Sequence, residues 1–251
     1  MRSLHLIIMI YPIRNFFLFS LLSFLIGTPV NALCLKDIAA IGLSADSISY
    51  TGSKDDETAS LSSNLGYGFK MAWMVYCPIK KIELQTYFRA RLFSFSDAKK
   101  IAIYSGIKES LSLLSFGFTG RKSFSYKKKN FEIPLDIEAR QEMGLIVLKS
   151  DNTLLQERFV NLKTISGLRY FAWSKGKRDI TLMLKVGALT PLSGSAKLGV
   201  VYGASVEFFQ KIGKVASLRF DLYSDHYDQR LGELSIARAE LGLRTNLVFR
   251  L

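Results

Sequence analysis

The last eleven residues of the chain alternate between apolar and polar side chains almost without interruption. One series is Leu241, Leu243, Thr245, Leu247, Phe249 and Leu251, and the other is Gly242, Arg244, Asn246, Val248 and Arg250. Successive side chains of a strand point to opposite faces, so this segment predicts a strand with one apolar face and one face that carries two arginines. The ends of soluble domains usually fray, whereas a strand in lipid must keep every backbone group paired. The uninterrupted ending therefore favours a strand that closes a barrel.

Other segments of the chain show the same period of two. The clearest are Leu65–Cys77, Ile82–Phe93, Ile180–Ala188, Leu198–Phe208 and Ala216–Leu222, and each has roughly the 9–11 residues of a tilted membrane-spanning strand. Weaker candidates are Ile38–Tyr50, Lys100–Ser105, Leu111–Thr119, Lys122–Ile133, Glu138–Lys149 and Glu157–Trp173. With the final strand, these segments predict an all-β, antiparallel up-and-down barrel of twelve strands, with Pro134 in a turn. Ten strands is the alternative, because residues 100–133 are poorly patterned.

The first 32 residues have the organisation of a secretory signal peptide. Arg2 and Arg14 provide positive charge, Phe16–Gly27 is apolar, and Val30 and Ala32 are small residues at the expected cleavage site. The apolar run is short for a spanning helix, which needs about 20 residues. The sequence thus predicts a signal peptide over 1–32 and a single barrel domain over 33–251.

Together, the export signal, the alternating segments and the terminal strand resemble those of bacterial outer-membrane β-barrel proteins. In that class the final strand typically ends in an aromatic residue that the assembly machinery reads, and here Leu251 takes that place, with Phe249 two residues earlier. The resemblance implies location in the cell outer membrane, with the lipid bilayer and lipopolysaccharide as partners. A soluble β-sandwich or a lipocalin-like barrel is the alternative, because alternation alone does not say whether the apolar face meets lipid or a core.

The formal charge of +13 is distributed over both turns and strand faces. If the apolar faces look outward, the lumen receives a set of cations that we predict to form an ion pathway: Lys70, Arg89, Arg91, Arg140, Lys163, Arg169, Lys185, Arg219, Arg238 and Arg244. Fewer acids share these faces, namely Glu83, Glu142, Glu157, Glu207, Asp221 and Glu240. The basic excess favours small anionic solutes. Lys99, Arg121 and Lys122 are expected on the outer side, where they could bind lipopolysaccharide phosphates.

These features predict a narrow porin-like channel with a weak anion preference. The alternatives are a closed structural or adhesin barrel that acts through its outer loops and, less favoured, a lipid-modifying enzyme. No motif for nucleic acid is present, so a nucleic-acid partner is not expected.

Little in the sequence indicates catalysis. Outer-membrane lipases use a His-x-Ser pair on a strand, whereas here Ser224 precedes His226, so we expect a loop histidine and no enzyme activity. No spacing of cysteine and histidine predicts a metal site, and no cofactor is expected. Cys34 and Cys77 are the two cysteines of the chain, and in an oxidising compartment we predict that they form a disulfide.

Overall fold

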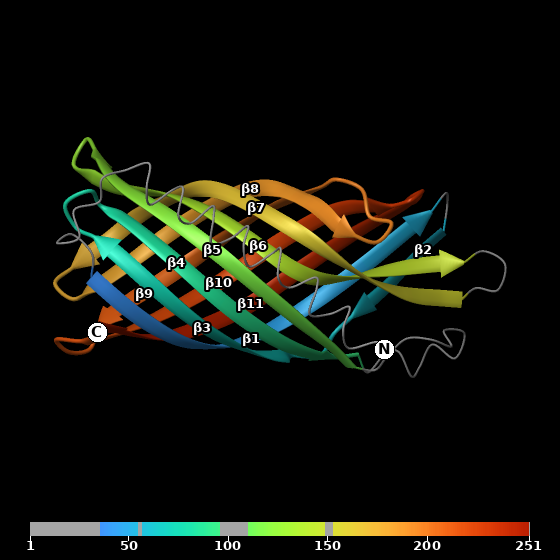
Figure 1. The fold of residues 1–251 in the computed structure, drawn as a ribbon, viewed down its shortest axis with the longest axis horizontal. Coiled ribbons are helices and arrows are strands. Elements are labelled where there is room, and N and C mark those ends of the chain that lie inside the picture. Colours follow the sequence, from blue (N-terminus) through green and yellow to red (C-terminus); the bar gives the residue numbers. More distant parts are fainter. Residues whose placement is uncertain (1–35, 55–56, 96–109, 149–152, 251) are drawn as a thin grey trace, which may run out of the picture. The chain divides into compact units, whose positions relative to one another are not determined.

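In the computed structural model, which describes residues 36–54, 57–95, 110–148 and 153–250, the strands form one antiparallel sheet that closes on itself (Figure 1). The strands are β1 (Lys36–Lys54), β2 (Glu57–Ser62), β3 (Gly66–Cys77), β4 (Ile82–Ser94), β5 (Ser110–Tyr126), β6 (Lys129–Leu148), β7 (Thr153–Lys175), β8 (Arg178–Ser193), β9 (Gly199–Lys211), β10 (Ala216–Leu231) and β11 (Leu234–Arg250). From β3 onward each strand pairs with the next in sequence, and β11 pairs with β1 to close the barrel. This is the up-and-down topology that the sequence predicts.

Ten strands close the barrel, and β2 is a short addition. β2 pairs with the far part of β1, starting at Ser49 opposite Ser62, whereas β3 pairs with the near part as far as Asp46 opposite Gly66. The expectation of twelve strands is therefore wrong, and the alternative of ten matches the structure.

The twelve-strand expectation fails because it divides β5. Gly120 and Arg121, expected in an outer loop, lie inside β5, which continues to Tyr126. The chain reverses at Lys127 and Lys128, whose φ angles of 45° and 64° are those of a two-residue turn that suits the twist of a hairpin. Such a turn usually contains Gly, Asn or Asp, so two lysines in the sequence do not indicate one. The expected strand Lys100–Ser105 lies outside the described residues.

Pro134 lies within β6 opposite Arg121 and not in a turn as expected. Proline lacks a backbone N–H, so it cannot donate to a ladder. The pairing of β6 with β7 is interrupted only between Glu132 and Leu135, and the Ser166 hydroxyl donates to the Pro134 carbonyl at 3.1 Å. The strand tolerates this proline because only one side of its ladder is affected.

The two ends of the barrel differ in their connections. Ile38 near the start of β1 pairs with Arg250 at the end of β11, so both lie at one end, which we call the terminal end. The turns 78–81, 127–128, 176–177 and 212–215 belong to the same end. Arg121 and Lys122 lie in β5 toward this end and not in a loop, and their place on the outer side stays a prediction. Lys99 lies outside the described residues.

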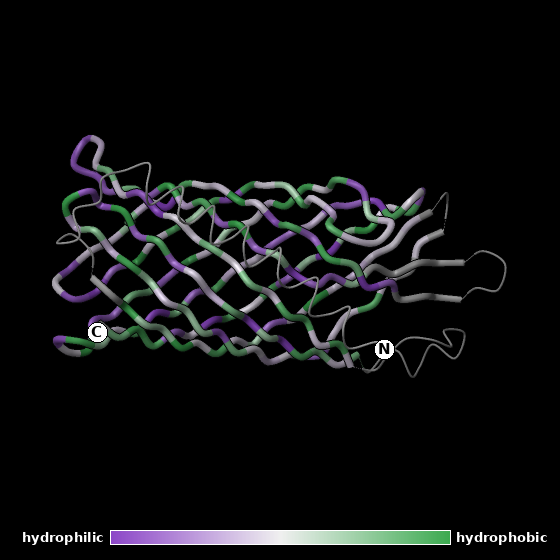
Figure 2. Tube along the Cα trace, viewed as in Figure 1, coloured by the Kyte–Doolittle hydropathy of each residue, from purple (hydrophilic) through white to green (hydrophobic). Residues whose placement is uncertain are grey.

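The outward face of the barrel is apolar, and the inward face is polar. Figure 2 shows hydrophobic and hydrophilic residues alternating along the strands. The apolar belt consists of exposed side chains on every wall strand, among them Leu43, Phe69, Leu92, Phe116, Leu135, Leu168, Leu184, Val206, Leu222 and Leu243. The charged residues of the same strands are mostly buried on the inner side. This arrangement matches a wall that faces lipid.

One strand leaves the wall before it ends. β5 and β6 pair from the turn as far as Ser115 opposite Arg140. Beyond that point, residues 110–114 pair only with β4 and residues 141–148 only with β7, and Figure 1 shows β5 and β6 diverging. β6 instead contacts β1, β2 and β11, which are not its neighbours in the wall. We call residues 141–148 the crossing segment, because they reach across the lumen.

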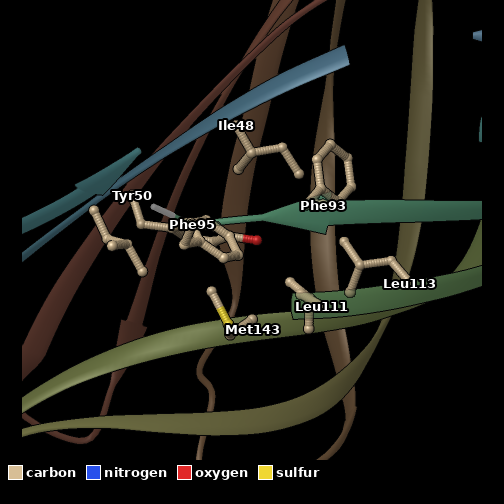
Figure 3. Close-up of a cluster of buried hydrophobic side chains, with 8 residues drawn as sticks. Ile48, Tyr50, Phe93, Phe95, Leu111, Leu113 and Met143 are labelled. Atoms are coloured by element: carbon tan, nitrogen blue, oxygen red, sulfur yellow. The ribbon is translucent and has the colours of Figure 1, made fainter. Parts of the chain in front are cut away.

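An apolar cluster fills the lumen beside the crossing segment. Met143 of that segment packs with side chains from β1, β2, β4 and β5 and from the residue that follows β4 (Figure 3). The cluster, which we call the apolar plug, contains Ile48, Tyr50, Leu61, Phe93, Phe95, Leu111, Leu113 and Met143, none more than 2 % exposed. Among the described residues, hydrophobic packing therefore fills part of the lumen toward the end opposite the terminal end.

Only one of the two cysteines lies within the described residues. Cys77 is buried at the end of β3, and Lys36, the first residue of β1, pairs with the adjacent Tyr76. Cys34 lies outside the described residues, so the disulfide stays a prediction that intact mass under non-reducing conditions would test.

Candidate functional site in the charged lumen

The ten lumen cations expected from the sequence all lie on the inner face of the wall. Arg91, Arg140 and Arg238 are buried in the middle of the barrel, and the others line a cavity nearer the terminal end. Arg121, which the sequence assigned to a loop, joins them. Their role as an ion pathway stays a prediction, but the structure brings them together in two distinct groups.

Glu240 of β11 is the centre of the first group. Its carboxylate accepts hydrogen bonds from Arg140 (Nη2 to Oε1, 2.6 Å) and from Arg91 (Nη1 to Oε2, 3.0 Å), and these three side chains are each 1 % exposed. Tyr227 donates a longer bond of 3.4 Å to Oε2. A buried charge is costly unless it is paired and hydrogen-bonded, and these contacts supply both. Paired side chains, and not an open pore, occupy this level of the lumen.

Glu142 connects this group to the crossing segment. It forms an ion pair with Arg140 of its own strand (Nε to Oε1, 2.6 Å) and accepts a hydrogen bond from Arg238 of β11 (Nη2 to Oε1, 3.2 Å). β6 and β11 are not neighbours in the wall, so the Glu142–Arg238 pair spans the lumen. The same pair that neutralises Glu142 therefore holds the crossing segment in place.

The second group surrounds a cavity of about 120 Å³, which we call the basic chamber. Several of its cations are paired: Arg169 with Glu207 at 3.2 Å, Lys185 with Asp225 at 2.6 Å, and Arg244 with Asp221 at 3.5 Å. The charged residues that line the chamber are Lys70, Arg89, Arg121, Lys163, Arg169, Lys185, Arg219 and Arg244 against Asp136, Glu207, Asp221 and Asp225. Eight cations line the chamber with four carboxylates, and three further carboxylates pair with lining cations: Glu83 with Arg121, Glu132 with Arg169 and Glu138 with Lys163. The local excess is therefore one positive charge.

Lys70 and Arg89 differ from the other six lining cations, each of which has a carboxylate partner. No carboxylate of the described residues lies within ion-pair distance of either side chain. Both lie over the ring of Tyr87, with Lys70 Nζ 4.3 Å and Arg89 Cζ 5.9 Å from its centroid. Cation–π contact offsets part of the cost of burial. The two cations are thus held in place by a ring and remain available to an anion.

Local packing fixes the position of this ring. The Tyr87 ring and hydroxyl occupy the space that a Cβ at Gly117 would fill, so glycine is required there. The hydroxyl donates to Asp136 Oδ1 at 3.1 Å, and Thr119 donates to the same oxygen at 2.7 Å. Asp136 Oδ1 is therefore engaged by two neutral donors, while its Oδ2 lies 3.8 Å from Lys163 Nζ.

The sequence analysis overestimated the basic excess of the lumen as a whole. It missed several inward carboxylates, namely Asp46, Glu132, Asp136, Glu138 and Asp225. Glu138 could have been found, because it has the same parity along the strand as Arg140 and Glu142. Asp225 was missed because it lies beyond Ala216–Leu222, the segment that the pattern predicts as a strand. Asp46, on an otherwise weakly patterned strand, accepts from Tyr223 at 2.5 Å, and no local signal predicts that contact.

His226 lies on the outward face of β10 and not in a loop as expected. Its Nε2 is 3.4 Å from the Ser224 hydroxyl, and its ring stacks on Tyr202 with centroids 5.4 Å apart. The two residues are i and i+2 on one strand face, which places them side by side in any strand. Whether the protein is an enzyme is not decided by this pair, and the expectation of no catalysis stays a prediction.

Comparisons with known proteins give the fold class. No family model and no curated protein matches the sequence. Among solved structures, the outer membrane protease OmpT from Escherichia coli has a TM-score of 0.53 at 8 % identity, covering 86 % of this chain and 97 % of that one. An outer membrane channel from Pseudomonas putida F1 has a TM-score of 0.48 at 12 % identity, covering 89 % and 99 %. The β domain of the Bordetella autotransporter BrkA has a TM-score of 0.39 at 12 % identity, covering 84 % of this chain and 98 % of that one.

The fold is therefore that of an outer-membrane β-barrel protein, as the sequence resemblance implies. At these identities the likeness concerns the fold and not the activity. No helix among the described residues is long and apolar enough to span a membrane. Within the same residues, no group of histidine, cysteine and acidic side chains is arranged to hold a metal ion.

We predict that Glu240→Gln destabilises the barrel by about 3–5 kcal/mol, because it leaves buried guanidinium groups without their shared counter-charge. The measurement is urea-induced unfolding in detergent micelles. Asp228→Asn, on the exposed outer face of β10, is the matched control and should change stability by no more than about 0.5 kcal/mol. Equal effects of the two substitutions would show that Glu240 is not the centre of the network.

Proposed function

We propose that the protein is a narrow channel for small anions in the outer membrane and that its lumen is closed in this conformation. The basic chamber carries the proposal, because Lys70 and Arg89 lie in it without a carboxylate partner. A basic region with low-dielectric walls attracts anions and raises their local concentration. The crossing segment and the apolar plug close the pathway beyond the chamber.

The proposal includes export and membrane insertion. Residues 1–32 act as a cleaved signal peptide and residues 33–251 as the mature barrel, with the final strand recognised by the outer-membrane assembly machinery. The fold and the apolar belt support this placement. Residues 1–35 and 251 lie outside the described residues. The bilayer and lipopolysaccharide are the surroundings that such a barrel would meet.

A charge placed on the apolar belt tests the membrane placement. Leu184 on β8 is 71 % exposed and is followed on the same face by Val186, also exposed. We expect Leu184→Arg to cost about 2–4 kcal/mol, whereas Asp228→Arg, at an exposed position of β10 that already carries a charge, should cost about 0–1 kcal/mol. Urea unfolding of the protein in lipid vesicles measures both. Equal and negligible costs would mean that the outer face does not meet hydrocarbon.

Conductance in planar bilayers tests the channel. We expect rare, small, anion-selective openings from the wild-type protein, and more frequent openings from Glu142→Ala, which releases the crossing segment from Arg238. The double variant Lys70→Gln, Arg89→Gln in the Glu142→Ala background should move the reversal potential under a salt gradient toward zero. Substituting glutamine at Lys127 and Lys128, in an exposed turn, is the matched control and should leave the reversal potential unchanged.

Two results would overturn the channel. Cation selectivity would show that the unpaired lysine and arginine do not govern the pathway. Silence of both the wild type and Glu142→Ala would favour a closed barrel that acts through its outer loops, which is the second candidate. The buried network around Glu240 supports that candidate, since it fills the middle of the lumen.

A further inference from the structure

The departure of β6 from the wall leaves a lateral opening. Where the pairing of β5 with β6 stops at Ser115 and Arg140, a depression of about 200 Å³ interrupts the outer surface. Its outer lining is mostly apolar and comes from Phe88, Leu114, Phe116, Ala139 and Val160, with Gln141 at its edge. β5 and β6 both continue past this point, so the opening is a gap between two strands and not the rim of the barrel.

The opening lies at one edge of the apolar belt. On the outward faces of β5, β6 and β7, the residues on its terminal-end side are Phe118, Ile137 and Leu162. On its other side the same faces carry Ser112, Gln141 and Arg158. A molecule in the opening would therefore have hydrocarbon on one side and polar groups on the other.

The inner side of the opening is polar and incompletely satisfied. Ser115 lines it and is 6 % exposed, and its hydroxyl has no hydrogen-bond partner among the described atoms. Arg140 lines it as well. Both residues belong to the inward faces of their strands, so they close the base of the depression, and its accessible lining is apolar.

We propose that the lateral opening binds a fatty carboxylate from the outer leaflet, with its hydrocarbon chain among the apolar lining residues and its carboxylate at Arg158. Arg158 is exposed two positions beyond Val160 on the same face, and no carboxylate of the described residues pairs with it. Arginine binds carboxylates through paired hydrogen bonds. The volume is below the roughly 300–1,000 Å³ of sites for drug-sized ligands, which suits one chain better than a whole phospholipid. This inference does not require that the lumen conducts anions.

Photolabelling of the full-length protein in lipid nanodiscs tests the site. The probe is dodecanoate with a diazirine at the end of its chain, and we expect labelled peptides to cover residues 112–116 and 139–141. Ala139→Trp, which fills the opening, should lower labelling there by about ten-fold or more. Ala239→Trp, on the outer face of β11, is the matched control and should leave labelling unchanged.

The head-group part of the site has its own test. Arg158→Gln should weaken labelling by dodecanoate but leave unchanged the labelling by the alcohol of the same chain, since only the carboxylate needs the guanidinium. A shift in electrophoretic mobility on heating shows that each variant is folded. Labelling spread evenly over the apolar belt and insensitive to Ala139→Trp would overturn the proposal. Displacement of the probe by a lysophospholipid but not by unlabelled dodecanoate would also overturn it, because the occupant would then be a phospholipid and not a fatty carboxylate.

Discussion

The ion pair between Glu142 and Arg238 is the interaction on which the arrangement of this barrel depends. It joins β6 to β11, two strands that are not neighbours in the wall, through the middle of the lumen. Glu142 is 1 % exposed and also contacts Arg140, which in turn shares Glu240 with Arg91. Removing one member leaves the others buried and unpaired, so the network behaves as a unit.

The same displacement of β6 has two consequences. Inside the barrel, Met143 reaches the apolar plug, which fills part of the lumen beyond the basic chamber. In the wall, β5 and β6 lose their pairing beyond Ser115 and Arg140, which creates the lateral opening. The barrel thus offers two separate environments, a basic one within the lumen and an apolar one on the outer surface of the wall.

The sequence predicts most of the wall because strands that face lipid on one side and the lumen on the other alternate apolar and polar side chains. Residues 180–188, 216–222 and 241–250 alternate faithfully and lie in β8, β10 and β11. Prediction fails where a local cue misleads: Pro134 suggests a turn, while the real turn is made by Lys127 and Lys128. The crossing segment could not be predicted, since residues 141–143 leave the wall because of partners on β1 and β11 that lie far away in sequence. The basic chamber was predicted in part, and its missed carboxylates belong to strands that were misassigned or weakly patterned.

Paired cysteines across β5 and β6 test most directly whether β6 leaves the wall. A disulfide needs Cα atoms within about 7 Å. Phe118 and Ile137 are partners in the paired part of the wall, and the same register would place Leu114 opposite Gln141 if the pairing continued. We expect Phe118→Cys with Ile137→Cys to form a disulfide readily in the folded protein, identified by peptide mass mapping, and Leu114→Cys with Gln141→Cys to stay reduced. Equal cross-linking of both pairs would show that β5 and β6 stay together and that neither the crossing segment nor the lateral opening exists.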